Sequence, residues 1–486
     1  MRGEVRQGRC GFAPDCIMTT QKGSFSMPLD AVLADIDKNA DAAEARLIEF
    51  LRIPSVSTDP AHAKDCQRGA DWLVDELRGL GFEAESRLTT GHPIVVGHAK
   101  AKRKDAPHVL FYGHYDVQPA DPLELWKTGP FEPHIQQGRE SPEIVARGAS
   151  DDKGQLLTFI EACRAYAGNG GLPCEITFLF EGEEETGSPS LPEFLVRYRD
   201  ELSAPALALV CDTGMWNART PAITVMLRGL VQEEVVLTGP THDLHSGMFG
   251  GPVVNPIHVI SKIIADLHDE SGRVALPGFY EGVAELPEDI AEQWRGLDFD
   301  QMAFLLSLGL TEVGGEAGRS VMEQIWARPT CDVNGVYGGY AGVGSKTVLP
   351  SKAGAKFSFR LVGAQNPKKI VESFRAFVAA RLPKDVKAEF TAHGASGALS
   401  LPFGSEPVKR AARALAEEWG VPAALIGCGG SIPIVGAFKK DLGMDALMIG
   451  FALEDDRIHS PNEKYSLTSF HKGARSWARV LAALAA

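Results

Sequence analysis

Apolar strand-like segments alternate with helical segments in the first half of the chain, and polar residues follow these strands directly. The run 108–112 ends at Gly113 and is followed by His114 and Asp116. Three further runs, at 144–146, 176–180 and 207–210, precede Asp151, Glu184 with Glu185, and Asp212. Alternating strands and helices predict a mainly parallel sheet covered on both faces, the doubly wound α/β class. Ligands of such sheets bind beyond the carboxyl ends of the strands, so these residues mark a candidate site.

The pattern of segments changes near Pro221 and returns to its first form near residue 395. The intervening segments are paired strands at 223–228 and 230–237, a helix through Ile257 and Leu267, an irregular, partly helical region at 276–329, strands at 333–340 and 354–361, a helix at 367–382 and a strand at 386–391. This βαββαβ order with an insertion is typical of an α+β sandwich. A Gly/Ser/Pro-rich linker then leads back to α/β alternation. We therefore expect a discontinuous α/β domain, 28–221 and 395–486, interrupted by an inserted α+β domain, 222–394.

The composition restricts the partners and the compartment of the protein. A chain of 486 residues is expected to form more than one hydrophobic core. Its net charge of −14 argues against nucleic-acid or anionic-membrane partners, because both need a basic surface. Eight cysteines without a C-x-x-C pair favour reduced structural thiols. Residues 1–27 lack the apolar core of a secretory signal and are expected to be a disordered tail or to precede the true start. These features predict a cytoplasmic protein.

Four carboxylates follow the run 176–180 within five positions: Glu181, Glu183, Glu184 and Glu185. An acidic run is usually a solvated loop. At the end of a buried strand, however, the carboxylates repel one another unless a cation relieves them, and the same holds for Asp151 and Asp152. Together with His114, Asp212 and the distant His459, they form a candidate two-metal site. Imidazole and carboxylate ligands suit Zn²⁺ or Mn²⁺.

Several motifs together resemble those of a known enzyme family. Four segments resemble the metal motifs of the aminoacylase/carboxypeptidase G superfamily: Gly113–Val117, Ala146–Gly154, Glu183–Ser188 and Asp212–Gly214. This superfamily includes acetylornithine deacetylase and succinyl-diaminopimelate desuccinylase. Its carnosinase-like dipeptidase branch is resembled most closely by Asp243–Gly251 and Gly344–Pro350. The motifs occur in the family's order from about Ala42 to the C-terminus. The set is specific, although no single motif is.

The resemblance implies two divalent metal ions per subunit, with Zn²⁺ as the first choice and Mn²⁺ as the second. Its ligand set falls on Asp151 as the bridge, on His114 and Asp212 at one metal, and on Glu185 and His459 at the other. Glu184 would be the general base that takes a proton from the bridging water. Asp116 would bind no metal. It would accept a hydrogen bond from His114 and fix the tautomer of that ring.

The resemblance also implies that the inserted domain is a lid and dimerisation domain of a homodimer. His245 would stabilise the oxyanion in the active site of the neighbouring subunit, and Thr347 would act across the same interface. Arg360 would bind the substrate carboxylate through two parallel contacts, and Ser431 would bind the substrate backbone. Plainer interpretations stay open. His245 can satisfy the backbone of a glycine-rich turn, and Arg360 can form a surface ion pair.

The leading hypothesis is a metal-dependent dipeptidase that cleaves a peptide bond near a free C-terminal carboxylate. An N-acyl-amino-acid or carbamoyl amidohydrolase using the same residues is the alternative. A non-catalytic binding protein on this fold is a third hypothesis. It predicts the loss of a ligand or of the base, whereas this sequence retains Glu184 and all five ligands. The loop 136–144 is longer and more polar than the family's turn, so the preferred substrate side chains stay open.

Overall fold

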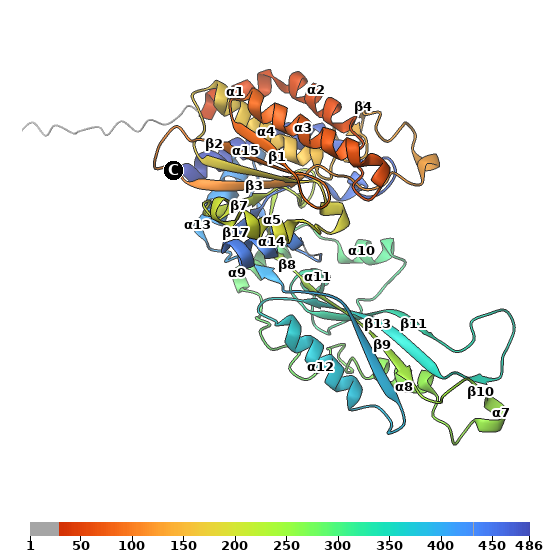
Figure 1. Ribbon diagram of the computed structural model, residues 1–486. Coiled ribbons are helices and arrows are strands. Elements are labelled where there is room, and N and C mark those ends of the chain that lie inside the picture. Colours follow the sequence, from red (N-terminus) through yellow and green to blue (C-terminus); the bar gives the residue numbers. More distant parts are fainter. Residues whose placement is uncertain (1–28, 431) are drawn as a thin grey trace, which may run out of the picture.

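The computed structural model describes residues 29–430 and 432–486, which form a larger and a smaller lobe (Figure 1). The larger lobe is built on a nine-stranded sheet with the order β1-β2-β6-β3-β7-β17-β8-β15, and β16 pairs with β8. Its strands are β1 (Glu83–Arg87), β2 (Ile94–Ala99), β3 (His108–His114), β6 (Glu175–Glu181), β7 (Leu207–Val210), β8 (Ala222–Leu227), β15 (Leu399–Ser400), β16 (Ala424–Cys428) and β17 (Asp445–Met448). The sheet thus combines strands from both ends of the sequence. The tail expected at 1–27 lies outside the described residues.

The centre of the large sheet is parallel, as the sequence predicted. β3 pairs in parallel with β6 on one side and with β7 on the other, and β17 pairs in parallel with β7. β16 also runs parallel to its neighbour β8. The pairs β1–β2, β2–β6, β17–β8 and β15–β8 are antiparallel. Because β3, β6 and β7 run in the same direction, their carboxyl ends meet at one edge of the sheet.

Helices cover both faces of this sheet, because its central strands carry apolar side chains on both sides. Phe111 of β3 stacks on Phe159 of α4 (Lys153–Gly168) and meets Trp477 of α15 (Leu467–Ala485) edge-on. The next residue, Tyr112, points to the opposite face and packs against Phe438 of the π-helical turn η4 (Phe438–Leu442). Other helices of this lobe are α1 (Leu29–Lys38), α2 (Ala40–Leu51), α3 (Ala63–Gly79), α5 (Leu191–Arg197), α6 (Arg199–Leu202), α13 (Glu406–Trp419) and α14 (Pro433–Ala437). The predicted doubly wound α/β class is confirmed.

The smaller lobe is built on a four-stranded antiparallel sheet with the order β11-β13-β9-β14. Its main elements are β9 (Gly229–Thr238), α8 (Pro256–Ala265), β11 (Thr330–Gly338), β13 (Lys352–Leu361), α12 (Pro367–Ala379) and β14 (Lys387–Ser396). Phe357 and Phe359 of β13 pack on Phe374 of α12 in its core. The βαββαβ order and the α+β class are as predicted. The exact domain limits stay a prediction.

The prediction that 223–228 and 230–237 pair with each other is wrong. β8 pairs with β16 and β17 in the large sheet, whereas β9 pairs with β13 and β14 in the small one. Arg228 alone separates the two strands, and even the shortest common hairpin loop needs two residues. β8 is buried along nearly its whole length, whereas buried positions alternate with more exposed ones along β9. Each strand therefore suits its own sheet, the first covered on both faces and the second on one.

A separate three-stranded sheet, β18-β5-β4, lies outside the large sheet. Its strands are β4 (His134–Gln137), β5 (Pro142–Val145) and β18 (Lys464–Ser466). The run 144–146 was expected to be a strand of the main parallel sheet, and it instead forms the end of β5 and pairs antiparallel with β18. β5 is exposed at its first residue and only partly buried at its second, so it does not meet the requirements of a strand covered on both faces. This small sheet leads directly into the loop that carries Asp151.

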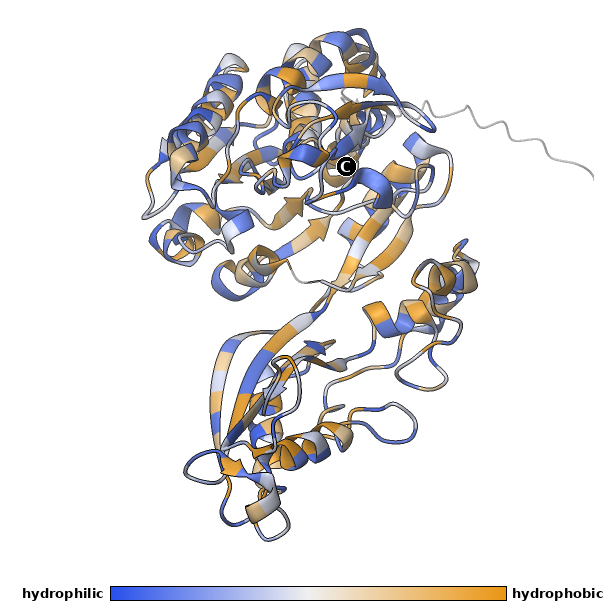
Figure 2. Cartoon of the chain, turned by 90° about the vertical axis from the view of Figure 1, so that its right-hand side faces the viewer, coloured by the Kyte–Doolittle hydropathy of each residue, from blue (hydrophilic) through white to orange (hydrophobic). Residues whose placement is uncertain are grey.

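The irregular region at 276–329 contains α9 (Glu288–Gly296), α10 (Gln301–Ser307) and α11 (Val321–Trp326). α9 and α11 pack against β16 of the large sheet, where Nε1 of Trp294 donates to the backbone oxygen of Leu425 at 2.7 Å. These two helices of the inserted region therefore pack on the larger lobe. Figure 2 shows the two lobes from the side. Among the described residues, the helices are all too short or too polar to span a bilayer.

Candidate metal centre

Three strands of the large sheet end together at the candidate site. His114 and Glu181 are the last residues of β3 and β6 and face each other across the ladder. Tyr112 of β3 is level with Val210 of β7, so His114 and Asp212 both lie two residues beyond the same rung. The short turn η3 (Glu184–Thr186) follows β6. The parallel register thus brings together three of the segments that the sequence singled out.

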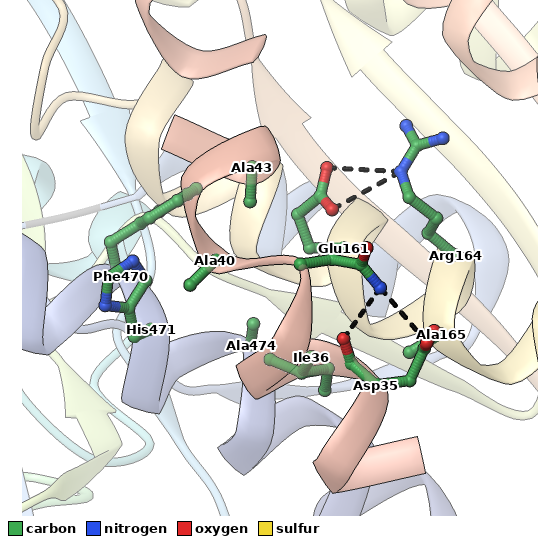
Figure 3. A pocket seen from close by; sticks show the side chains of 11 residues that line it. Asp35, Ile36, Ala40, Ala43, Glu161, Arg164, Ala165, Phe470, His471 and Ala474 are labelled. Atoms are coloured by element: carbon green, nitrogen blue, oxygen red, sulfur yellow. Dashed lines mark hydrogen bonds and ion pairs between the residues drawn. The ribbon is translucent and has the colours of Figure 1, made fainter. Parts of the chain in front are cut away.

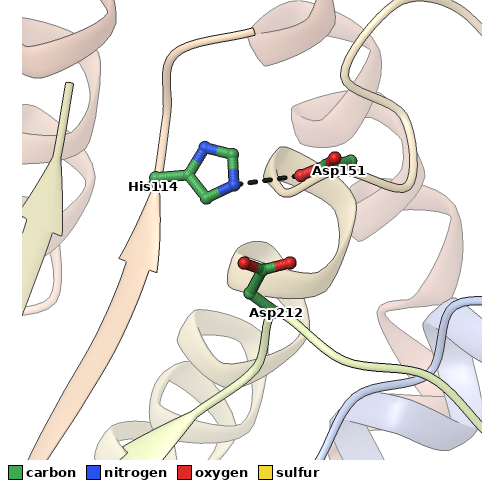
Figure 4. A group of neighbouring side chains, drawn as sticks. All are labelled: His114, Asp151 and Asp212. Atoms are coloured by element: carbon green, nitrogen blue, oxygen red, sulfur yellow. Dashed lines mark hydrogen bonds and ion pairs between the residues drawn. The ribbon is translucent and has the colours of Figure 1, made fainter. Parts of the chain in front are cut away.

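His114, Asp151 and Asp212 form the first group of candidate metal ligands (Figure 4). Nε2 of His114 lies 2.9 Å from Oδ1 of Asp151. One possible ligand atom from each of the three residues lies within 4.8 Å of the others. His114 is fully buried, and Asp151 is 9% exposed.

Asp151, Glu185 and His459 form the second group, whose ligand atoms also lie within 4.8 Å of one another. Nε2 of His459 lies 2.9 Å from Oδ2 of Asp151 and 3.3 Å from Oε2 of Glu185. Nε2 of Gln118 donates to the same Glu185 oxygen at 2.8 Å. Asp151 belongs to both groups, with one carboxylate oxygen on each histidine. This arrangement has the form of a bridging carboxylate between two adjacent metal positions.

Asp116 holds two parts of the site in place. Nδ1 of His114 lies 3.1 Å from the backbone oxygen of Asp116 and 3.4 Å from its carboxylate Oδ1. The shorter contact is therefore to the backbone carbonyl, whereas the sequence prediction assigned it to the carboxylate. That carboxylate accepts hydrogen bonds from the backbone N–H groups of Glu184 (3.2 Å) and Glu185 (3.1 Å) and from the Ser57 hydroxyl (2.6 Å). It thus orients the η3 turn as well as the histidine.

The electrostatics of the cluster favour bound cations. Burial raises the pKa of Asp212 well above its usual range, and the neighbouring Asp151 charge adds to this effect. Burial also disfavours the ionised form of Asp151, but hydrogen bonds with His114 and His459 outweigh it and keep the pKa of Asp151 below its usual range. Hydrogen bonds with Asp151 and Glu185 raise the pKa of His459 to about 10. The carboxylates thus retain protons on the histidines, and divalent cations can take the place of these protons.

Glu184 lies beside both groups and is partly buried. Burial raises its pKa, the charge of His114 opposes this shift, and the charges of Glu185 and Asp151 reinforce it. A carboxylate with raised proton affinity next to a two-metal group suits proton transfer. The role of Glu184 as a general base stays a prediction.

Asp152 has a structural role that sequence reasoning missed. Its Oδ2 accepts hydrogen bonds from the backbone N–H of His114 and from the Cys211 thiol, both at 3.2 Å. Burial raises the pKa of Asp152 to about 7, against the opposing charge of His114. Asp152 thus ties the ends of β3 and β7 to the start of α4. Its adjacency to Asp151 marked it as acidic, but only the fold shows which strands it joins.

The residues predicted in the inserted domain do not join this cluster within one chain. His245 is exposed at the end of β10 (Leu244–His245), and Thr347 is exposed directly before β12 (Val348–Leu349), with which β10 pairs beside α7 (Ser246–Phe249). Figure 1 places β10 and α7 at the end of the smaller lobe, remote from β3 and β7. Nδ1 of His245 accepts a hydrogen bond from the backbone N–H of Gly247 at 3.0 Å, so the plainer turn-capping interpretation also holds.

Arg360 lies half-buried near the end of β13. Burial lowers the pKa of Arg228 to about 10, and the positive charge of Arg360 contributes to this shift. Two guanidinium groups near each other form a positive region that an anion would relieve. Ser431 lies outside the described residues.

An imidazole–carboxylate cluster at the carboxyl edge of a doubly wound sheet, with an α+β lobe inserted in the chain, defines a protein of the candidate two-metal class. Residues 110–483 match the peptidase family M20/M25/M40. The chain belongs to this family, and the resemblance seen in its motifs is confirmed.

Named relatives are similar over nearly their whole length. The chain is 31% identical over 482 residues to the Cys-Gly metallodipeptidase DUG1 of Candida albicans, covering 94% of this chain and 98% of that protein. It is 27% identical over 494 residues to the human Beta-Ala-His dipeptidase, covering 95% of each chain. The crystal structure of the M20 family metallo-carboxypeptidase Sso-CP2 from Sulfolobus solfataricus has a TM-score of 0.76 and 32% identity, covering 91% of this chain and 99% of that one.

Proposed function

We propose that this chain is a two-metal dipeptidase that hydrolyses the peptide bond of small peptides with a free C-terminal carboxylate. The observation that carries the proposal is Asp151, whose two carboxylate oxygens each contact a different histidine. The relatives named as metallodipeptidases, which match nearly the full length of the chain, support the substrate class.

The five ligands divide between two metal positions that share Asp151. His114 and Asp212 complete one position, and Glu185 and His459 complete the other. The mixed imidazole and carboxylate donors suit Zn²⁺ first and Mn²⁺ second. When bound, these ions supply Lewis acidity toward the scissile carbonyl and lower the pKa of a water molecule.

Glu184 carries out the proton transfers. Its carboxylate takes a proton from the attacking water and delivers a proton to the leaving amine nitrogen. Asp116 orients this step, because it binds the backbone N–H of Glu184 and contacts His114 at the same time. Partial burial raises the pKa of Glu184, so its protonated form is accessible after the first transfer.

Residues from both predicted domains supply the substrate contacts. Arg360 binds the C-terminal carboxylate through its guanidinium fork, and Ser431 binds the substrate backbone. His245 stabilises the oxyanion in the site of a partner subunit, and Thr347 assists from the segment paired with β10. The exposed position of both residues at the lobe's tip supports action between subunits.

A homodimer formed by the inserted domain follows from this arrangement. β11 is an edge strand of the small sheet and exposes Val333, Val336 and Tyr337. Unpaired strand edges with apolar side chains are surfaces on which a second chain can pair. We place the domain limits close to 28–221, 222–394 and 395–486, shifted so that β8 stays with the large sheet and all of β14 with the small one, and we place the protein in the cytoplasm. The described cysteines are all free, which agrees with a reducing compartment.

A metal-by-substrate matrix tests the proposal. Metal-free protein is reconstituted with Zn²⁺ or Mn²⁺ and offered Cys-Gly, β-Ala-His, a C-terminally amidated dipeptide, a tripeptide and an N-acetyl amino acid. We expect hydrolysis of free dipeptides and strongly reduced hydrolysis of the amidated one. Release of the acyl group without hydrolysis of any dipeptide would instead assign the site to an N-acyl-amino-acid amidohydrolase.

A further inference from the structure

The loop 146–151, which carries Asp151, directs several backbone N–H groups toward one buried position. It connects β5 to α4 and turns sharply at Gly148, whose φ is +79°. A Cβ at this position would lie 2.5 Å from Cγ1 of Val117, so the backbone conformation and the tight packing both require glycine. The backbone N–H groups of Gly148, Ser150 and Asp151 all point to the same side of the loop, where they bind one carboxylate.

The side chain of Glu463 occupies that position. Its Oε1 accepts hydrogen bonds from the backbone N–H groups of Ser150 (2.9 Å) and Asp151 (3.0 Å). Its Oε2 accepts one from the backbone N–H of Gly148 (2.8 Å) and one from Nη1 of Arg147 (2.9 Å). Each carboxylate oxygen therefore binds two donors, and the four donors come from one loop of five residues.

The pairing of two short strands places Glu463 beside this loop. Lys464 of β18 lies opposite Val145 of β5 in the antiparallel ladder. One residue further, the backbone N–H of Ala146 donates to the backbone oxygen of Glu463 at 3.1 Å. The segment that brings Glu463 to the loop also carries His459, four residues earlier. One segment thus contributes both a candidate ligand and the carboxylate that binds the bridging residue's loop.

A fully buried carboxylate is costly unless its hydrogen-bonding capacity is used, and here it is. Burial raises the pKa of Glu463 to about 7, and the positive charge of Arg147 opposes this shift. Arg147 is itself buried, and its Nη2 donates to the backbone oxygen of Pro119 at 3.1 Å. The opposite charges of Glu463 and Arg147 thus balance each other, while Glu463 fixes the loop backbone by hydrogen bonds. An apolar side chain of equal size could not form these hydrogen bonds.

We propose that Glu463 is a positioning residue for Asp151. It fixes the backbone of the Asp151 loop so that Oδ1 faces His114 and Oδ2 faces His459, and it thereby sets the affinity of both metal positions. The proposal rests on the bridging role of Asp151 under the proposed function. Partners that orient ligands in this way typically contribute about 10- to 100-fold in metal affinity.

The test is a titration of metal-free protein with Co²⁺, followed by the visible absorption of the bound ion, which reports ligand geometry without any substrate. Glu463→Gln keeps the volume of the side chain but replaces one acceptor oxygen with an NH₂ group that opposes the loop's own N–H donors. We expect wild-type protein to bind two Co²⁺. We expect Glu463→Gln to bind Co²⁺ about 10- to 100-fold more weakly and with a changed spectrum.

Glu161→Gln is the matched control, because Glu161 is also a buried carboxylate that binds arginine. It lies on α4, ten residues after Asp151, and accepts hydrogen bonds from Arg46 (2.8 and 2.6 Å) and from Arg164 (3.3 Å). Figure 3 shows its contact with Arg164. We expect Glu161→Gln to lower the thermal midpoint of unfolding without changing the Co²⁺ affinity or spectrum. Wild-type Co²⁺ affinity and spectrum in folded Glu463→Gln would overturn the proposal.

Glu463→Asp covers the case in which Glu463→Gln does not fold. The shorter side chain keeps the charge next to Arg147 but withdraws the acceptors from the loop, so weakened Co²⁺ binding is expected, and unchanged binding would overturn the proposal. Asp151→Asn separates this inference from the proposed function. If Asp151→Asn also binds two Co²⁺ normally, the bridging role itself is wrong. If Asp151→Asn loses Co²⁺ while the Glu463 variants do not, only the positioning role is wrong.

Discussion

The carboxyl edge of the large sheet and the tip of the smaller lobe hold two parts of the proposed active site, and they are built in opposite ways. At the sheet edge, His114 is fully buried and its neighbours are fixed by hydrogen bonds from distant segments. At the tip, His245 and Thr347 are exposed: Nδ1 of His245 accepts a hydrogen bond from the nearby backbone N–H of Gly247, and the backbone oxygen of Thr347 accepts one from the backbone N–H of Ser246. One chain thus brings its candidate metal ligands together by itself, whereas under the proposed function the tip would join an active site only in a dimer.

The largest effect is expected at the sheet edge, from Glu184→Gln. Loss of the general base should lower kcat by about 10²- to 10⁴-fold, because the amide cannot accept the proton of the attacking water. Metal content should stay unchanged, since Glu184 is not among the five ligands. Steady-state kinetics measure kcat, and metal analysis of the same preparation measures the metal content. Glu193→Gln, an exposed carboxylate on α5, is the control. Substantial retained turnover, or loss of metal, would refute the assigned role.

At the tip, His245→Ala should lower kcat by about 10²- to 10³-fold, the usual cost of removing an oxyanion donor. The comparison of the two regions makes a sharper prediction for mixtures. When His245→Ala and Glu184→Gln proteins are mixed and allowed to exchange subunits, each mixed dimer contains one complete site, so activity should return.

His242→Ala, an exposed histidine of the same loop, is the control for the tip and should remain active. A mixture no more active than its two components, under conditions where sedimentation shows subunit exchange, would mean that His245 does not act across subunits.

The central part of the site was predictable from sequence because parallel strands bring consecutive strand ends to one edge. His114, Glu185 and Asp212 follow apolar runs that are easy to recognise, and the register of β3, β6 and β7 makes them neighbours. Asp151 was also recognised, but for a partly wrong reason. β5 is not a strand of the main sheet, and its pairing with β18 depends on a segment more than 300 residues away.

Contacts between such distant segments explain what the sequence could not show. Glu463 has no apolar strand before it, and its function depends on a turn whose N–H groups converge only in the folded chain. The carboxylate of Asp116 was expected to bind His114, yet it serves the Glu184 turn as well. The β8–β9 error has the same origin, because adjacency in sequence suggested a hairpin where one residue separates two sheets.

A smaller effect is expected from Arg360, the proposed contact of the substrate carboxylate. Arg360→Met should lower kcat/KM for a free dipeptide by about 10- to 100-fold, the cost of one charged contact. The amidated dipeptide lacks the charge that Arg360 binds, so its kcat/KM should not change. Arg381→Met, an arginine of the same lobe paired with Asp266, is the control. An equal loss on both substrates would show that Arg360 supports the fold rather than the carboxylate.

The smallest effect is expected on the solvent face of the small sheet, at Glu234. Its carboxylate binds Nζ of Lys356 (2.6 Å), the hydroxyl of Tyr337 (2.6 Å) and Nε2 of His393 (2.9 Å). The hydrogen bond from Lys356 contributes most to lowering the pKa of Glu234, to about 2. The folded-state pKa lies below the unfolded one, so the stabilisation is present above about pH 4.5 and is lost as the pH falls toward 2.

Thermal unfolding of wild type and Glu234→Gln between pH 6 and pH 3 measures this effect. The two midpoints should differ slightly at pH 6 and converge as the pH falls, because protonation makes the wild-type side chain resemble the amide. A difference that is independent of pH would mean that the packing of this side chain, and not its charge, stabilises the exposed face. The proposed dimer has a further consequence for this measurement. If β11 pairs with a partner chain, Tyr337 is covered, and the difference between the two unfolding midpoints should grow with protein concentration.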